Sequence, residues 1–368
     1  MINDMIKGDY MKDVSNKITR FQYMFIIQAS MIGLGILSLP SSVCDVAQQS
    51  GWIPTLLSGV YPLFITFVGY IIHRNAKFLD FVQLNNKLYG KILSYVICFV
   101  FFVYFLLQGS LVTAGFANVL NFSTTKFLSP YSIIIITILL TFLSTNEGLT
   151  NIGRLAEFLF PLTVLLIILP LYFINRGDST NLLPIISDYK LILKAMPDTF
   201  FSYSGVEICF FIFPFLTSKK KINIFSAIGS LITITLYTIV VFITIYYCGF
   251  NLTSKLQYPL LYLIASSEIP VLSNFEPLFI FLWGAKIFLT VSISGFIVTY
   301  IFSQVTKIPY YKSCIVSFGL IFLLSLFFVP DYNRTFFAGL LIPIMFIFVF
   351  LWSLISLLLS FIRKGVSK

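Results

Sequence analysis

Charged side chains are scarce in this chain. Asp, Glu, Lys and Arg make up 10% of its 368 residues, whereas a soluble domain carries about 25%. Hydrophobic residues reach 58%, and the mean hydropathy is +0.96. So little charge cannot cover the surface of a soluble domain, and the composition therefore predicts an integral membrane protein.

Histidine is nearly absent, and the cysteines are not clustered. The one histidine, His73, lies beside Arg74 at the end of a hydrophobic segment, where we expect an interfacial residue. The sequence has no HExxH motif, no phosphate-binding loop and no plausible Ser-His-Asp set. We therefore predict no enzyme, no catalytic residues, no metal and no cofactor. The five cysteines stand singly, without metal or disulfide spacing, at Cys44, Cys98, Cys209, Cys248 and Cys314.

Hydrophobic runs fill most of the chain. Each is near or above the roughly 17–25 residues that cross a bilayer as a helix. The sequence leaves no room for a soluble domain, so we expect one transmembrane transporter-like domain over 1–368, with an N-terminal segment 1–20 and a tail 363–368. We predict ten membrane-spanning helices, at residues 21–46, 52–72, 92–119, 130–146, 155–174, 195–217, 222–249, 277–303, 311–330 and 335–362.

Basic residues fall mostly on one side of this arrangement. If the N-terminus is cytoplasmic, the inner segments hold most of the 24 Lys and Arg residues, including the run Lys219 to Lys221. The positive-inside rule then predicts that both termini are cytoplasmic. The net charge of +10 follows from basic inner loops that face anionic lipid headgroups. We predict a lipid bilayer, and no nucleic acid, as the partner of these charges.

Two hydrophobic segments are interrupted at corresponding positions. The first predicted span contains Gly33, Gly35 and Pro40, and the sixth contains Ser204–Glu207. Glycine and proline weaken a helix that lipid otherwise requires to be unbroken. Since the two spans enter from opposite sides, the pattern is typical of a five-plus-five inverted repeat with a ligand site at the midplane. An alternative remains open, in which the glycines only allow close helix packing.

The interrupted segments also resemble a known superfamily. Gly33–Pro40, which reads GLGILSLP, and the following Ala47–Trp52 resemble the first helix of the amino acid–polyamine–organocation superfamily, and Ser204–Glu207 resembles its broken sixth helix. The length, the ten spans and the connector Ile152–Phe158 are similar to the spore germination permease family, the B subunit of germinant receptors. The resemblance implies a LeuT-like all-α fold with broken helices 1 and 6. It also implies a multi-pass protein of the spore inner membrane, a small-molecule germinant, an A-type membrane subunit and a C-type lipoprotein partner.

The ligand site is expected where the two broken helices meet. A half-helix N-terminus has unpaired N–H groups and a partial positive charge, which suit a carboxylate. Apolar and aromatic neighbours suit the rest of a small zwitterion, so we expect an amino acid. The candidate ligand-binding residues are Gly33, Leu34, Gly35, Tyr203, Ser204, Gly205 and Glu207.

Charged residues inside the spans leave alternatives open. Glu207 lies near the midplane, where a carboxylate needs a partner. In one alternative Glu207 contacts an amino group of the ligand or carries a proton. In the other it forms an ion pair with Lys286, which reaches a similar depth. Arg154 and Glu157 lie one helical turn apart near the inner mouth of the fifth span. They are expected to pair, either structurally or as a gate.

Two functions fit such a pocket. One is a germinant sensor, in which ligand binding passes a conformational change to partner subunits. The alternative is a proton-coupled amino acid permease, which a flux assay in liposomes would separate from a sensor. Ser292 and Ser294 lie near the position where relatives bind sodium, but they are not adjacent hydroxyls, so we do not expect sodium dependence.

Overall fold

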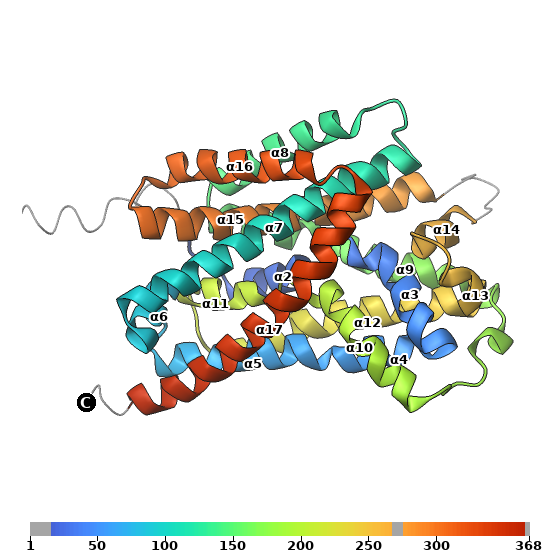
Figure 1. Ribbon diagram of the computed structural model, residues 1–368, viewed down its shortest axis with the longest axis horizontal. Helices are drawn as coiled ribbons and strands as arrows, with labels where there is room; N and C mark the ends of the chain where they lie inside the picture. The colour runs from blue at the N-terminus through green and yellow to red at the C-terminus, as the bar shows by residue number, and fades with distance from the viewer. Residues whose placement is uncertain (1–15, 267–274, 365–368) are drawn as a thin grey trace, which may run out of the picture.

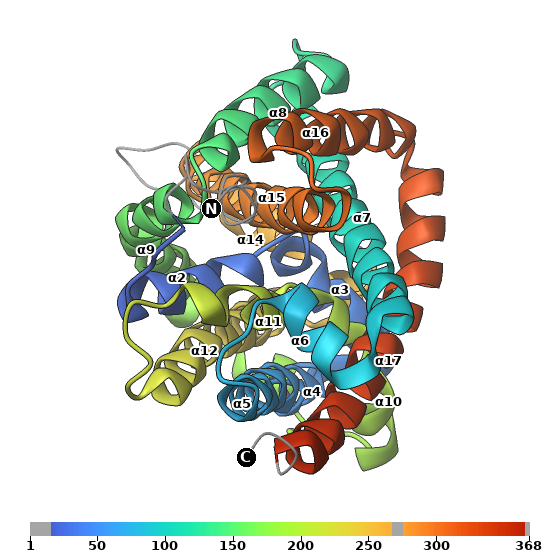
Figure 2. The same ribbon diagram turned by 90° about the vertical axis from the view of Figure 1, so that its left-hand side faces the viewer.

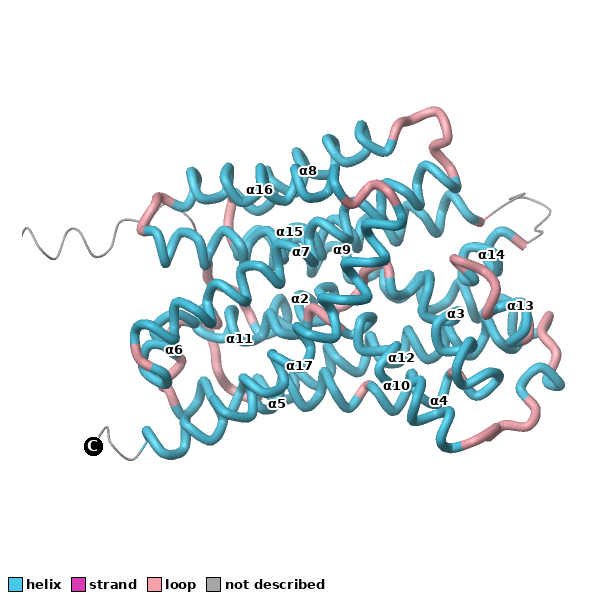
Figure 3. Tube along the Cα trace, in the orientation of Figure 1, coloured by secondary structure: helices cyan, strands magenta, loops and turns pink. Residues whose placement is uncertain are grey.

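The computed structural model describes residues 16–266 and 275–364. Apart from one isolated bridge, all regular structure in these residues is helical (Figure 3), which confirms the all-α class. The predicted N-terminal segment 1–20 and tail 363–368 lie partly outside the described residues. Figure 2 shows α2 and α11 near the middle of the molecule, surrounded by the longer helices.

The first half of the chain contains helices at all five predicted spans. The elements are α2 (Arg20–Ser30), α3 (Gly35–Ala47), α4 (Trp52–Ser58), α5 (Val60–Asn75), α6 (Phe81–Tyr89), α7 (Lys91–Ser123), α8 (Pro130–Asn146) and α9 (Leu149–Leu171). Figure 1 shows the 33-residue α7 running obliquely past its neighbours, as expected for a hydrophobic segment longer than one perpendicular span.

The second half mirrors this order. Its elements are α10 (Tyr189–Tyr203), η5 (Val206–Ile208), α11 (Cys209–Ile212), η6 (Phe213–Phe215), α12 (Ile222–Cys248), α13 (Phe250–Thr253), α14 (Pro259–Ala265), α15 (Glu276–Thr306), α16 (Tyr310–Phe327) and α17 (Asp331–Lys364). Seven helices of the described residues are long and apolar enough to cross a membrane, and α2 with α3 forms a bent eighth. The number of ten crossings stays a prediction, because α8 and the segments of the sixth span are shorter.

The first span breaks between Ser30 and Gly35. The axes of α2 and α3 differ by 51° across this gap. Pro40, which we expected to contribute to the interruption, lies inside α3 instead. The interruption therefore coincides with the glycines that precede α3 and not with the proline, although Pro40 cannot donate a hydrogen bond to Ile36 O.

The sixth span breaks where the sequence predicts. α10 ends at Tyr203, and Gly205 adopts a left-handed conformation with φ of 106°. A β-carbon at position 205 would lie 2.2 Å from the Ser30 carbonyl oxygen. Only glycine fits this backbone conformation and this close approach, so the breaks of spans one and six touch each other.

The segment before α2 ties three helices together at one end of the molecule. Ile18 pairs with the end of the sixth span, donating its N–H to the Phe215 carbonyl and accepting from Thr217 N–H, both at 3.0 Å. The Asn16 side chain accepts from Leu149 N–H at 3.0 Å, at the start of α9.

His73, expected at the interface, is fully buried, and its Nε2 lies 2.9 Å from the Phe210 carbonyl.

Candidate ligand-binding site

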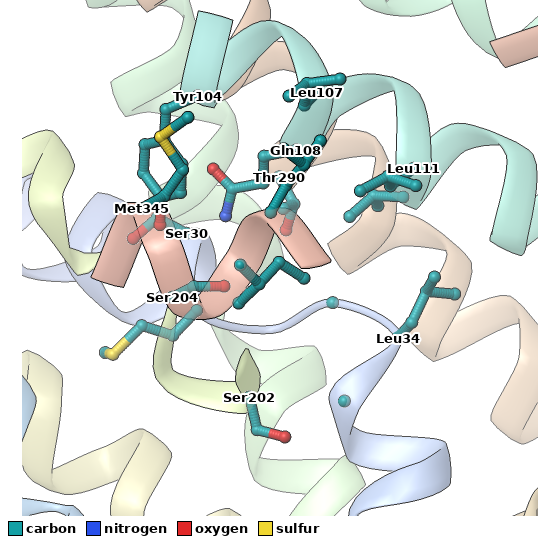
Figure 4. Close-up of a pocket in the computed structure, with 16 residues that line it drawn as sticks. Ser30, Leu34, Tyr104, Leu107, Gln108, Leu111, Ser202, Ser204, Thr290 and Met345 are labelled. Carbon is teal, nitrogen blue, oxygen red and sulfur yellow. The ribbon is translucent and has the colours of Figure 1, made fainter. Parts of the chain in front are cut away.

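A cavity lies where the two breaks meet (Figure 4). It encloses about 30 Å³, which is room for roughly two water molecules. An amino acid therefore fits only if wall side chains move. The lining residues are Ser30, Met31, Gly33, Leu34, Gly35, Tyr104, Leu107, Gln108, Leu111, Val112, Ser202, Ser204, Thr290, Leu341, Ile342 and Met345.

The carbonyl groups of the first break already have partners. Tyr237 donates to Met31 O at 2.6 Å, and Trp283 donates to Gly33 O at 3.0 Å. The Thr290 hydroxyl lies 2.6 Å from Ile32 O and 3.0 Å from Ala29 O. α12 and α15 thus supply donors to three of the acceptors that the interrupted helix exposes, the carbonyls of Met31, Ile32 and Gly33.

Unlike these carbonyl groups, the first N–H groups of α3 have no capping side chain. The N-cap residue of this 13-residue helix is Leu34, whose side chain makes no capping hydrogen bond. The Leu37 N–H is paired with Leu34 O at 3.0 Å, so the uncapped N–H groups are those of Gly35 and Ile36. Its first N–H groups lie beside the cavity, because Gly33, Leu34 and Gly35 all line it. With the carbonyls paired and the N–H groups uncapped, this wall favours an anionic group such as a carboxylate.

Glu207 lies behind the cavity wall. Tyr61 of α5 donates to one carboxylate oxygen. The other oxygen accepts from Tyr104 at 3.2 Å and from Gly205 N–H at 2.7 Å. The side chain is 1% exposed, and these three donors supply the partners that a buried carboxylate requires. Glu207 therefore links the sixth-span break to α5 and α7.

Of the two alternatives left open for Glu207, the ion pair with Lys286 is not formed. Lys286 is fully buried, and its Nζ has no hydrogen-bond partner. Glu207 instead accepts from Tyr61, Tyr104 and Gly205 N–H. The predicted pair between Arg154 and Glu157 is not seen in the described residues either: Glu157 accepts from Gln22 of α2 at 3.2 Å. Both side chains are exposed, where an ion pair stabilises little.

Four of the seven predicted ligand residues line the cavity. These are Gly33, Leu34, Gly35 and Ser204. The other three, Tyr203, Gly205 and Glu207, do not. Tyr203 instead donates to Thr55 O at 2.8 Å and supports the wall from outside. Their roles as ligand contacts remain predictions.

Sequence analysis named no residue of α7 as a ligand contact. Tyr104 and Gln108 line the cavity, and Figure 4 shows the Gln108 amide facing the non-helical segment of the first span. Gln108 is the one amide side chain between Lys91 and Asn118. An isolated amide in a long apolar helix is a signal that could have pointed to the site.

The sodium expectation remains untested. Ser292 Oγ is buried without a hydrogen-bond partner, and its carbonyl accepts from Thr145 at 3.1 Å. Ser294 lies near Gly109 of α7. No group of three or more His, Cys, Asp or Glu side chains that could hold a metal occurs in residues 16–266 and 275–364.

A comparison with known proteins identifies the family of this chain. A sequence model described as "Spore germination protein" matches residues 17–335. The chain belongs to the spore germination permease family. It is 27% identical to the spore germination protein YndE of Bacillus subtilis strain 168 over 80% of this chain and 82% of that one. It is 24% identical to spore germination protein B2 of the same strain, over 76% and 77%. GerQB of Bacillus cereus is 22% identical over 76% and 78%.

Solved structures share the fold of this spore germination permease. MhsT, crystallised with L-phenylalanine, superposes with a TM-score of 0.71 at 17% identity, covering 95% of this chain and 97% of MhsT. A Na⁺-coupled sialic acid symporter gives 0.69 at 15% identity, over 94% and 81%. At such identities the likeness shows the fold alone. The LeuT-like fold predicted from the sequence is confirmed.

Proposed function

We propose that this protein is the ligand-binding subunit of a nutrient germinant receptor and binds a free amino acid between its first and sixth spans. The observation that carries the proposal is the asymmetry of the first break. Its carbonyls are paired with Tyr237, Trp283 and Thr290, whereas the N–H groups of α3 remain uncapped beside the cavity. That arrangement favours a carboxylate.

The narrow cavity supports a sensor that changes shape. A space of about 30 Å³ must widen before an amino acid enters. A ligand that binds the widened state more tightly shifts the population toward it. Partner subunits, an A-type membrane protein and a C-type lipoprotein, would detect that state in the spore inner membrane, with both termini of this chain cytoplasmic.

Binding to the purified protein tests the proposal. We expect at least one free amino acid to raise the thermal unfolding temperature in detergent, and its N-acetyl and methyl-ester derivatives to bind much more weakly. Each derivative leaves a buried polar group unpaired, at a cost of about 1–3 kcal/mol. Equal affinity for the amino acid and both derivatives would contradict the zwitterion site.

A proton-coupled permease is the second candidate. The buried Glu207 favours it, because a carboxylate that touches a cavity-lining tyrosine could exchange a proton during transport. Radiolabelled amino acid uptake into liposomes with a pH gradient separates the two functions. Saturable, gradient-driven uptake would establish the permease. Binding without uptake, together with co-purification of an A-type and a C-type subunit, would establish the receptor.

A further inference from the structure

We propose that Gln108 receives the ammonium group of the ligand and so selects molecules that carry a free amine but no net charge. This inference rests on the proposed function. The Gln108 side chain lines the cavity from α7, and its Oε1 is buried without a hydrogen-bond partner. An amide oxygen is an acceptor, and a buried acceptor that stays unpaired is costly. A donor on the ligand would remove that cost.

The position of Gln108 suits a zwitterion. Its Nε2 lies 3.1 Å from where a β-carbon on Gly205 would be, so the amide reaches the sixth-span break. The uncapped N–H groups of α3 lie on a different wall of the same cavity. A ligand whose carboxylate occupies the α3 wall can therefore direct its ammonium toward α7.

Several other acceptors near the cavity already have donors. The carbonyls of Met31, Ile32 and Gly33 accept from side chains of α12 and α15. Glu207 accepts three hydrogen bonds and does not line the cavity. Among the side-chain oxygens that line the cavity in the described residues, Gln108 Oε1 is thus a buried acceptor without a donor.

The cavity wall also carries no formal charge. Its lining residues include no Asp, Glu, Lys or Arg. A zwitterion balances its own charges between the α3 wall and Gln108. A ligand with an additional charged group would place that charge in an apolar environment without a counterion, which is unfavourable. We therefore expect acidic and basic amino acids to be rejected.

A comparison of amines with their des-amino analogues tests the role of Gln108. The probes are L-alanine, L-leucine and L-phenylalanine, each paired with propionate, 4-methylpentanoate or 3-phenylpropanoate, and binding is measured on the full-length protein in nanodiscs. For a pair that binds, we expect the wild type to prefer the amine at least tenfold. Gln108→Met keeps a long unbranched side chain but lacks the acceptor, so the preference should fall at least tenfold. A further probe is the C-terminal amide of the same amino acid, which is a cation because a neutral carboxamide replaces its carboxylate. Gln108→Glu adds a negative charge and should bind this amide more tightly than the wild type does.

The outcomes separate this inference from the proposed function. Gln83→Met, at an exposed position of α6, serves as the matched control and should leave every ratio unchanged. If the wild type binds none of the amino acids, the proposed function fails and this inference with it. If the wild type binds but Gln108→Met keeps the wild-type preference for the amine, only the assignment to Gln108 is overturned. If Gln108→Met does not fold, Gln108→Glu decides: unchanged affinity for the amide would overturn the assignment.

Discussion

Tyr104 lines the central cavity and at the same time donates its hydroxyl hydrogen to the Glu207 carboxylate at 3.2 Å. Tyr61 donates to the other carboxylate oxygen, and its ring packs against Phe346 of α17 with centroids 4.5 Å apart. A ligand that displaces Tyr104 therefore disturbs a bonded chain from α7 through the sixth-span break to α5. This is a contiguous physical route by which the cavity could influence α5 and α17.

Removing the Tyr104 hydroxyl should weaken this chain. Tyr104→Phe keeps the ring but takes one donor from a buried carboxylate, and we expect the free energy of unfolding to fall by about 1.5–3 kcal/mol. In the double variant with Glu207→Gln, the combined loss should be smaller than the sum of the two separate losses. Tyr104→Phe removes the hydrogen bond, and Glu207→Gln removes the charge that strengthens it. Unfolding in detergent measures this. Tyr95→Phe on the exposed side of α7 is the control, and full additivity would show that the bond contributes nothing.

Lys286 should behave independently of Glu207. Since its Nζ is buried and unpaired, a lysine there costs about 2.5–3.5 kcal/mol on membrane insertion scales. We therefore expect Lys286→Met to raise the thermal unfolding temperature. Its effect should add to that of Glu207→Gln within about 0.5 kcal/mol. Strong non-additivity in this double-mutant cycle would restore the ion pair that the sequence predicted.

The two glycines of the first break should differ in tolerance. A β-carbon on Gly35 would lie 2.9 Å from the Ser202 Cα, whereas on Gly33 its nearest neighbour is Val112 at 3.8 Å. Gly35→Ala should push α3 from α10 and destabilise by about 1–3 kcal/mol, with reduced ligand affinity. Gly33→Ala is the matched control for folding and should be close to wild type. Comparable stability of the two variants would show that the α3–α10 approach is not tight.

The sequence predicted the breaks but not their contacts. Gly33, Gly35 and Gly205 mark the interruptions because glycine weakens helices wherever it occurs in them. The contact of Gly205 with Ser30 joins residues far apart in the chain, and no local pattern encodes it. For the same reason the sequence could not decide between the alternatives for Glu207, and the ion pair with Lys286 is not formed: equal depth in the membrane gives no direction around the helix axis. Tyr61 and Tyr104 are the partners of Glu207 in place of Lys286, but in the sequence nothing distinguishes them from the other residues among 20 tyrosines.

Asp80, which lies outside the membrane spans, should make the stability of the protein depend measurably on pH. It caps α6 by accepting from Gln83 N–H at 2.9 Å, and burial raises the pKa of its carboxyl group. The folded state therefore holds this proton more tightly than the unfolded chain, so stability is greater at acidic pH and falls as pH rises through the raised pKa. Asp80→Asn keeps the cap and should flatten this part of the profile of unfolding temperature against pH. An unchanged profile would contradict the assignment to Asp80.

Thr290 should determine how well the first break is held for the ligand. Its hydroxyl lies within hydrogen-bonding distance of the Ile32 and Ala29 carbonyls and also lines the cavity. Thr290→Val has nearly the same shape but no donor, so it leaves a buried carbonyl unpaired at a cost of about 1–3 kcal/mol. Part of that loss should appear as weaker amino acid binding, because the neighbouring N–H groups of α3 are positioned by the same segment. Thr290→Ser restores the donor and should recover affinity even though it removes a methyl group. The binding constants of the two variants are therefore compared. If Thr290→Ser and Thr290→Val weaken binding equally, the lost methyl group and not the hydrogen bond is responsible. In that case the hydrogen bonds from Tyr237 and Trp283 hold the break without Thr290.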